Sequence, residues 1–560
     1  MINIGSRREC FWDTYLIDTE KSTAEIRLNK PVSREIVMEY PEDWGCNVSY
    51  INLFHDNGIY RMYYMGWNKD RYLQAEPGSP DKSMRVCYAE SKDGLRWIKP
   101  ELGIVEWAGS KKNNILFSAD WLDNFYVFRD DNPYADPKER YKAVVQRRRE
   151  LIAFVSPDGI HFTESHVITN KGSFDSLNTV LWDAKAQKYR GYFRSFHNIP
   201  VEGGDFLDLI RNEMCEAPFR EKVKEHGLED LYAAVRRGEP LPEMITRMEA
   251  VEKINEALRE LVPEVDIENW YVKVLPGIEA EKVYTPEGYL RRGPLVNMGI
   301  RDIRYIESED FRHWSEPIRL DYGDKADFPM YTNNVSIYER APHMFIGFPT
   351  RYTERQEWTK AYDVLCGQQA RKYRMEKWEK REGLAITDCL FMCSRDGVHF
   401  TRYDEAFLKN GPENGYNWVY GDCYPAHGLV VTDSDMEGAD REINLFCKEN
   451  FGNRDRMRRY VLRQDGFCSL HAGEKEKVLV TKPFVFEGSN LIANMATSAY
   501  GYMYFSLEDT QGNRIQSCEM FGDSIDKTVG FEGDLSAFSG KEVVMTVRMR
   551  DADLYAMKFE

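Results

Sequence analysis

Short segments in which apolar and aromatic residues alternate with polar ones recur along the chain, each directly after a turn. The segments begin at Gly58, Glu139, Gln187, His343 and Glu442. Alternation with a period of two residues predicts β-strands. A pair of strands of this length cannot bury a core by itself. The pattern therefore predicts five similar sheets that pack around one axis.

A second repeat runs in phase with these strands and consists of a polar turn that ends in an aromatic residue. Its copies occupy residues 91–97, 156–162, 308–314, 394–400 and, in degenerate form, 464–467. A short apolar segment precedes each copy. One turn and one strand pair per unit is typical of the outer hairpin of a β-propeller blade. The sequence thus predicts a five-bladed β-propeller.

The interval between the second and third turns is the longest and indicates an insertion. From about residue 203 to residue 286, apolar residues follow the spacing of one helix face, as in Met244, Met248 and Val251. The methionine-rich face predicts burial against a partner subunit in a homo-oligomer or against a neighbouring loop.

A smaller charged segment, 354–382, is also expected to be helical and to lie between blades four and five. Helical insertions of this kind either cover the functional face or form a dimer contact, and both alternatives stay open.

The pattern changes again after the last turn. Residues 543–550 and 555–559 alternate between apolar and polar side chains, and 509–513 have the composition of a hairpin turn. This predicts a C-terminal β-sandwich over residues 467–560, after a propeller over residues 1–463. The expected fold class is all-β: a five-bladed β-propeller with a C-terminal β-sandwich and a helical insertion.

Charge and cysteine content narrow the range of functions. A net charge of −17 argues against nucleic acids and anionic membrane surfaces as partners, since both need basic patches. No apolar run approaches the roughly 18 residues of a membrane span, and the first residues lack the apolar stretch of a signal peptide. The 11 cysteines lack the spacing of a zinc site, which favours reduced thiols. We expect a cytoplasmic protein without a metal or a cofactor.

Candidate chemistry lies where the innermost strands of a propeller converge on its axis, so the residues that open each blade are the candidates. Each blade opens with at least one carboxylate. Glycoside hydrolysis uses two such groups, because one protonates the leaving oxygen while the other attacks or activates water. Asp175 and Asp131 are the predicted catalytic pair, with Glu42 or Asp43 as a third acid.

Other polar residues near these positions are candidates for holding a sugar. They are Asn47, Arg129, Asn178, Arg194, Tyr331, Asn333, Asp422 and Glu449. The aspartates inside the repeated turns, such as Asp158, are explained by side-chain capping of the turn and are interpreted as structural. No HxxxH or HxH pair indicates a metal site.

Several short motifs resemble a known family. They occupy residues 11–18, 88–94, 112–115, 174–176, 465–467, 481–483 and 553–555. In these motifs the chain resembles bacterial proteins described as glycoside hydrolase family 32 N-terminal-like. Those proteins are similar to the five-bladed propellers of the invertase, arabinanase and levansucrase-like superfamily. The resemblance spans nearly the whole chain outside the helical segments and implies a C-terminal β-sandwich, as in the invertase branch.

The resemblance also implies roles for individual residues. Residues 129–133 match in part the Arg-Asp-Pro motif that holds the stabiliser of invertase-type enzymes, which implies this role for Asp130 or Asp131. Blade one lacks the Asn-Asp-Pro-Asn motif of the family nucleophile, and blade three has Asp175 in place of Glu-Cys. The implied function is a glycoside hydrolase that cleaves a small glycoside or oligosaccharide, such as a fructoside or an arabinoside.

Two other functions remain open. A glycoside phosphorylase needs basic residues beside the acids to hold phosphate, and several are available: Arg190, Arg194, Arg301, Arg304 and Arg351. A non-catalytic sugar-binding propeller would keep its aromatic residues and tolerate loss of the acids. Release of reducing sugar with and without phosphate separates the two enzymes, and no release in either condition favours the binding protein.

Overall fold

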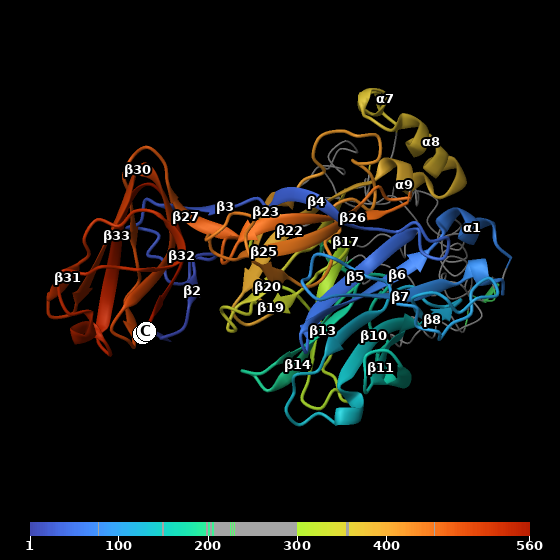
Figure 1. Ribbon diagram of the computed structural model, residues 1–560, viewed down its shortest axis with the longest axis horizontal. Helices are drawn as coiled ribbons and strands as arrows, with labels where there is room; N and C mark the ends of the chain where they lie inside the picture. The colour runs from blue at the N-terminus through green and yellow to red at the C-terminus, as the bar shows by residue number, and fades with distance from the viewer. Residues whose placement is uncertain are drawn as a thin grey trace.

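The protein consists of a propeller and a C-terminal sheet domain that lie side by side (Figure 1). The structure is a computed structural model, and it describes residues 1–560 except 77, 148–149, 198–199, 202–203, 206–223, 226, 228, 230–299, 327, 354, 356–357 and 453. The expected helical insertion at 203–286, including Met244 and Met248, therefore lies almost entirely outside the described residues. At its start, β15 (Pro200–Val201) and β16 (Gly204–Asp205) form a small ribbon.

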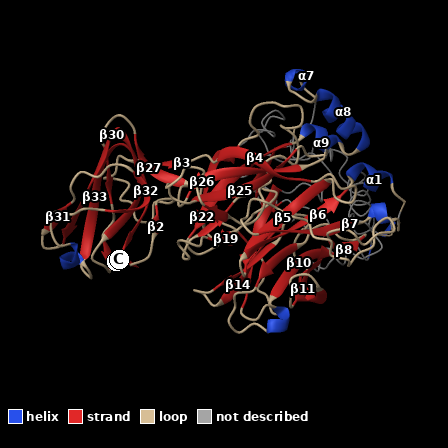
Figure 2. Ribbon diagram, viewed as in Figure 1, coloured by secondary structure: helices blue, strands red, loops and turns tan. Residues whose placement is uncertain are grey.

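Five antiparallel sheets form the propeller, as the sequence repeats predict (Figures 1 and 2). Blade I contains β5 (Asn47–Asp56), β6 (Ile59–Trp67), β7 (Met84–Ser91) and β8 (Ile115–Ala119). Blade II contains β9 (Tyr126–Arg129), β10 (Tyr141–Arg147), β11 (Glu150–Ser156) and β12 (Thr163–Thr169). Blade III contains β13 (Thr179–Asp183), β14 (Lys188–His197), β17 (Ile300–Ser308) and β18 (Ile318–Arg319).

Blades IV and V complete the ring. Blade IV contains β19 (Ser336–Ile337), β20 (Phe345–Gly347), β21 (Thr350–Thr353), β22 (Ile386–Ser394) and β23 (Phe400–Leu408). Blade V contains β24 (Val430–Thr432), β25 (Glu442–Glu449), β26 (Arg456–Arg463) and β4 (Val32–Glu39). Because β4 comes from the N-terminal part of the chain and pairs with β26, strands from both ends of the repeat region close the propeller.

The charged segment predicted to be helical forms three short helices. These are α7 (Lys360–Val364), α8 (Gln368–Lys377) and α9 (Lys380–Leu384). They connect β21 to β22, which pair with each other, so the segment lies within blade IV and the expected position between blades four and five is wrong. The strands on either side of the helices pair only in the folded sheet, which explains why this was not visible in the sequence. No helix among the described residues is both long enough and apolar enough to cross a membrane.

The remaining helical segments in the described part of the chain are short. Helix α1 (Lys69–Gln74) follows β6, with Asn68 as its N-cap, and the 3₁₀ turns are Pro80–Lys82, Pro137–Glu139 and Leu535–Phe538.

The repeated turns are built as the capping interpretation predicts. In the second copy, the Asp158 carboxylate accepts hydrogen bonds from the amides of Ile160 and His161, both at 2.8 Å. Ser156 Oγ accepts from the Gly159 amide at 2.9 Å. The first, third and fourth copies repeat the aspartate contacts. These aspartates therefore shape the turn and are not among the residues that line the cavity described below.

Each turn also joins two blades. Arg61 Nη1 and Tyr63 Oη on β6 of blade I donate to the carbonyl oxygens of Asp158 and Gly159 in the blade II turn, at 2.9 and 2.8 Å. Gly159 has a φ of +77°, and a Cβ there would lie 2.9 Å from Tyr63 Oη, so the close contact requires glycine. Arg190 and Tyr192 of blade III make the same contacts to the blade IV turn. The motif repeats because each copy fastens one blade to the blade before it.

The C-terminal domain is a ten-stranded β structure around its own core. Its C-terminal strands are β27 (Cys468–Ala472), β28 (Lys477–Val480), β29 (Phe484–Phe486), β30 (Leu491–Asp509), β31 (Arg514–Gln516), β32 (Asp523–Thr528) and β33 (Glu542–Phe559). The long strands β30 and β33 pair along most of their length, and their register shifts between Thr497 and Tyr502. Their buried side chains, such as Met545, Val547 and Met549, follow the predicted alternation.

The N-terminal strands belong to this domain and not to the propeller. β1 (Ile2–Gly5) pairs with β29, β2 (Glu9–Cys10) with β33, and β3 (Glu25–Leu28) with β27. The expectation of a propeller that starts at residue 1 thus needs correction, because residues up to Leu28 complete the C-terminal sheet. Strands of two to four residues show no measurable alternation, so the sequence could not assign them to a distant sheet.

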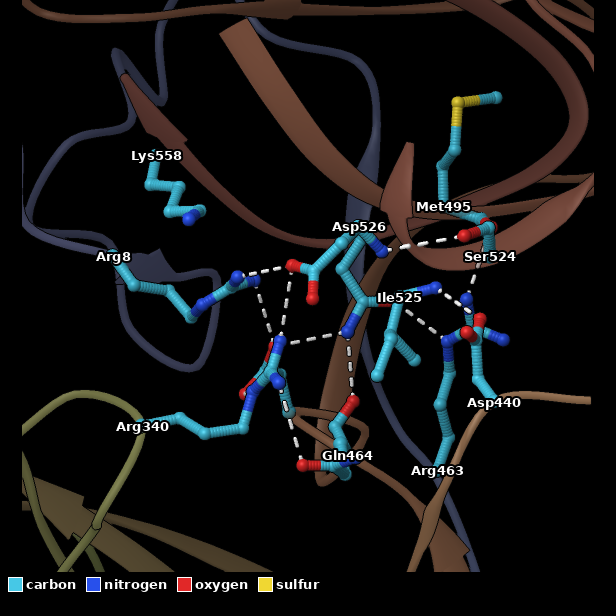
Figure 3. A network of polar contacts seen from close by, with 12 residues as sticks. Arg8, Arg340, Asp440, Arg463, Gln464, Met495, Ser524, Ile525, Asp526 and Lys558 are labelled. Atoms are coloured by element: carbon cyan, nitrogen blue, oxygen red, sulfur yellow. Dashed lines mark hydrogen bonds and ion pairs between the residues drawn. The ribbon is translucent and has the colours of Figure 1, made fainter. Parts of the chain in front are cut away.

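A polar network fixes the contact between the two domains. Asp465, in the degenerate fifth turn, is fully buried and accepts from Arg8 at 3.1 Å, Tyr338 at 2.8 Å and Arg340 at 3.0 Å. Arg8 and Arg340 also reach Asp526 of the C-terminal domain, as Figure 3 shows. Buried carboxylates are stable only when their oxygens are paired in this way.

Candidate active site

A cavity of about 260 Å³ lies where the inner ends of the blades meet α1 and α9. Aromatic side chains make up much of its wall: Tyr50, Trp67, Tyr72, Tyr331, Trp378, Tyr420, Tyr424 and Phe451. Charged side chains are set among them: Lys69, Asp123, Asp175, Glu379, Arg381, Glu382 and Lys448. Apolar walls with a few converging polar groups are characteristic of small-molecule sites.

Asp123 is an acid of the cavity with a strongly shifted pKa. It lies three residues before β9, the innermost strand of blade II, so the start of that strand carries it to the axis. Its Oδ2 atom is buried and receives no hydrogen bond from any described residue. Burial raises the pKa of Asp123 to about 6, and the Arg194 guanidinium offsets this only in part. A carboxyl group with such a pKa carries a proton for a useful fraction of the time near neutral pH.

Asp175 is another carboxylate of the cavity, and unlike Asp123 it is exposed and paired with a cation. It lies before β13 and forms an ion pair with Arg194, while its own side chain is 52% exposed. Arg194 on β14 is only 3% exposed and is held by Ser173, whose carbonyl oxygen and Oγ accept from it at 3.1 and 3.0 Å. Burial lowers the pKa of Arg194 to about 10, so it stays charged at neutral pH. A fixed cation beside a solvated carboxylate favours the ionised form.

Tyr331 lies beside these groups at the start of blade IV. Its hydroxyl oxygen accepts a hydrogen bond from Tyr420 at 3.0 Å, and the Arg194 guanidinium lies 5.4 Å from its ring centroid. Burial alone would raise the pKa of Tyr331, but the cations of Arg194 and Arg381 outweigh it, and the pKa is lowered. The phenol is therefore a polar, polarised group next to the two carboxyls.

Tyr50, a further aromatic residue of the cavity wall, has a strained backbone conformation. Tyr50 has a φ of 51°, in the left-handed region, where the register of β5 against β6 shifts. Its hydroxyl donates to the Asp175 carbonyl oxygen at 3.2 Å. Bulges and left-handed residues cost free energy and often re-aim side chains at functional sites.

The α9 helix covers one side of the cavity. Glu382 accepts from Lys69 of α1 at 2.5 Å, and both side chains are buried. Trp378 Nε1 and the Tyr373 hydroxyl donate to Asp70 of α1 at 2.9 and 3.0 Å. Of the two roles expected for the charged helical segment, these contacts support covering the functional face.

The other predicted catalytic residues lie outside the cavity lining. Asp131 is 64% exposed and pairs with Arg129 at 2.7 Å. Glu42 pairs with Lys99 at 2.7 Å, and Asp43 with Arg71 at 3.2 Å. The structure therefore brings Asp175 together with Asp123 and not with these three acids.

Of the predicted sugar-binding residues, Tyr331 lines the cavity and Arg194 contacts the acid that does. Asn47 and Asn333 are buried and make hydrogen bonds that hold strands and blades together. Asn178 bonds to the carbonyl oxygens of Phe174 and Ser176.

The remaining candidates also have structural partners. Asp422 is buried and accepts from Asn410, outside the cavity lining, and Glu449 pairs with Arg456 and Arg458. Arg129, as described, is paired with Asp131. Three of the arginines considered for phosphate are likewise in ion pairs with aspartates outside the lining: Arg190, Arg304 and Arg351.

Sequence reasoning missed Asp123, because it took residues 129–133 as the start of blade II. The innermost strand, β9, is only four residues long and ends at Arg129, so Asp131 lies at the far end of that strand from Asp123. The signal that could have found it is the Asp-Asn pair at 123–124, directly before an aromatic strand, in the place that Asp175 takes in blade III. Among the described residues, no group of three metal-binding side chains is placed to share an ion.

Comparison with known proteins gives distant structural similarities only. No family model matches the chain, and no curated protein matches its sequence. Among solved structures, the chain is similar to a glycoside hydrolase, with a TM-score of 0.38, 11% identity and coverage of 78% of this chain and 92% of that one. It is also similar to an N-acetylgalactosamine deacetylase from F. plautii in complex with blood group B trisaccharide (TM-score 0.38, 10% identity, coverage 78% and 94%).

A third similar structure is a fructofuranosidase variant from Schwanniomyces occidentalis complexed with fructosylnystose. Its TM-score is 0.33 at 9% identity, with 95% of this chain and 97% of that chain covered. Since all these scores are below 0.5, the case for an activity rests on the cavity itself.

Proposed function

We propose that the chain is a glycoside hydrolase in which Asp123 is the general acid and Asp175 is the second carboxylate. The observation that carries the proposal is that two carboxyl groups with contrasting surroundings line one cavity. Asp123 is partly buried, with a buried Oδ2 atom and a raised pKa, whereas Asp175 is held beside the Arg194 cation. The surroundings of one acid favour its protonated form and those of the other favour its charged form. The first acid is therefore assigned as the proton donor and the second as the charged partner.

In this scheme Asp123 gives its proton to the glycosidic oxygen as the bond to the anomeric carbon breaks. Asp175 stabilises the positive charge that develops on the sugar, and either attacks the anomeric carbon or takes a proton from the attacking water. Aromatic rings of the wall, such as Trp67 and Trp378, offer flat apolar surfaces to a sugar ring. A cavity of about 260 Å³ suits a small glycoside.

The experiment is a hydrolysis screen of the full chain against aryl glycosides, with fructosides and arabinofuranosides included. Asp175→Asn should lower kcat by roughly a thousandfold on any substrate that the parent cleaves, and Asp123→Asn should do so on substrates whose leaving group needs protonation. The control is Asp158→Asn in the repeated turn, which should keep the parental rate because asparagine also caps turns.

Each assay is run with and without inorganic phosphate, because a phosphorylase would release sugar phosphate and depend on it. Wild-type rates in both cavity variants would refute the assignment of the acids. If no glycoside is cleaved in either condition while sugars bind, the chain is a sugar-binding propeller and not a hydrolase.

A further inference from the structure

Three buried polar side chains with few partners meet at the propeller axis, beside the two acids. Lys448 on β25, Tyr424 and Asn334 line a small recess. Lys448 and Tyr424 also line the main cavity, so the recess and the cavity share a wall. The groups come from blades IV and V and meet only in the folded ring.

Hydrogen bonding leaves these groups incomplete. Lys448 is 3% exposed, and its Nζ donates to the Val48 carbonyl oxygen at 2.8 Å. An ammonium group has three donors, and the Val48 carbonyl oxygen takes one of them. The Tyr424 hydroxyl and Asn334 Oδ1 are buried and bonded to no described residue.

The carboxylate that attracts Lys448 most strongly does not complete its hydrogen bonding. Asp455 attracts Lys448 but is already engaged, since it accepts from Asn47 Nδ2 at 3.3 Å and from the amides of Val48 and Gly452 at 2.8 and 3.0 Å. Burial lowers the pKa of Lys448, and the Lys69 cation adds to this. The aromatic faces of Phe451 and Tyr424 lie 4.3 and 5.4 Å from its Nζ.

A buried cation with open donors is costly unless a bound group supplies acceptors. We propose that Lys448 and Tyr424 form a subsite for an oxyanion, which is either a carboxylate carried by the sugar or free phosphate. The ammonium and the phenol each donate to an oxyanion oxygen, and such charge-assisted bonds are the strong ones. Asn334 Oδ1 lines the recess, whose volume of about 10 Å³ is too small for the ligand itself. The carboxylate source deepens the proposed function and rests on it, whereas anion binding itself does not.

The chain carries a net charge of −17, so an anionic ligand needs local positive charge to enter. Arg194 and Lys448 place such charge at the cavity, where low-dielectric walls strengthen its effect. A neutral sugar would accept hydrogen bonds from Lys448 but would not neutralise its charge. The subsite therefore predicts a preference for anionic over neutral ligands of the same shape.

The test is isothermal titration calorimetry of the full chain with glucuronate, galacturonate, glucose, galactose and inorganic phosphate. Wild-type protein is compared with Lys448→Met, Tyr424→Phe and Lys171→Met. Lys171 is 59% exposed and pairs with Glu316, so its variant controls for the loss of one charge outside the cavity. Tyr424→Phe removes only an unbonded hydroxyl and keeps the ring, so it reports on the subsite even if Lys448→Met fails to fold.

We expect an anionic probe to bind the wild type and to lose on the order of 10- to 100-fold in affinity in Lys448→Met, with a smaller loss in Tyr424→Phe. Lys171→Met should bind as the wild type does. Binding of uronates identifies a substrate carboxylate, and binding of phosphate identifies free phosphate. The proposal is overturned if no anion binds better than the neutral sugars, or if the variants bind anions as tightly as the wild type. Because binding is measured without turnover, a failed hydrolysis screen leaves this result standing.

Discussion

Replacing Asp123 by asparagine should stabilise the folded protein at neutral pH while it removes the activity. Burial raises the pKa of Asp123 from 3.8 to about 6. The difference between these two pKa values corresponds to about 3 kcal/mol of unfolding free energy. The folded state loses this stability when Asp123 ionises. Asparagine has the shape of the protonated acid and never ionises, so the variant avoids that loss.

The gain in stability from Asp123→Asn should grow as the pH rises. The folded state holds the proton more tightly than the unfolded chain does, so this contribution to stability is complete below about pH 4 and is lost as the pH rises through about 6. Wild type and Asp123→Asn should therefore melt at the same temperature at about pH 4. At about pH 8 the variant should melt about 3 to 4 °C higher, taking the unfolding entropy of a cooperative unit of roughly 400 residues.

Differential scanning fluorimetry at the two pH values provides the measurement, and Asp158→Asn provides a control of opposite sign. Burial alone would raise the pKa of Asp158. Hydrogen bonds from the backbone amide and the side chain of His161 outweigh burial and hold this pKa well below its usual range. Asp158→Asn should therefore lose stability at neutral pH. Equal melting shifts of Asp123→Asn at both pH values, or a lower melting temperature at the higher pH, would refute the burial argument.

Three further results follow from the cavity. The kcat/KM of the parent should fall tenfold per pH unit above about 6, because only protonated Asp123 donates a proton; a profile flat to about pH 9 would contradict this. Arg194→Lys, which cannot hold both Ser173 and Asp175, should lower kcat/KM by roughly 10- to 100-fold with little change in circular dichroism; an unchanged rate would show that the ion pair is not needed. Glu382→Gln leaves the Lys69 cation buried without its partner and should cost about 3 kcal/mol in denaturant unfolding; a loss below about 1 kcal/mol would mean that the pair does not hold α9 in place.

The propeller could be predicted because the repeated turn also makes contacts between neighbouring blades. The turn around Gly159 recurs in sequence since each copy has to fit against the strand before it, as the contacts from Arg61 and Tyr63 show. The β1, β2 and β3 strands carry no such signal. They are short, and their partners lie more than 400 residues away in the chain, so only the folded structure assigns them to the C-terminal sheet.

The lining of the cavity was predicted only in part for the same reason. Asp175 could be found because it opens a blade in front of a regular strand. Asp123 was missed, because β9 is short and the following residues 129–133 resemble a known motif. The pairing of Lys69 with Glu382 joins residues that are 313 apart in sequence, and no local pattern marks either one.

The most direct test of the proposed acid compares two leaving groups. A glycoside of 2,4-dinitrophenol departs without protonation, whereas a methyl glycoside of the same sugar needs a general acid. We predict that Asp123→Asn keeps most of its turnover on the dinitrophenyl glycoside and loses roughly a thousandfold on the methyl glycoside, while Asp175→Asn loses activity on both. Equal losses on the two substrates in Asp123→Asn, or wild-type rates on both, would contradict the role of Asp123 as the proton donor.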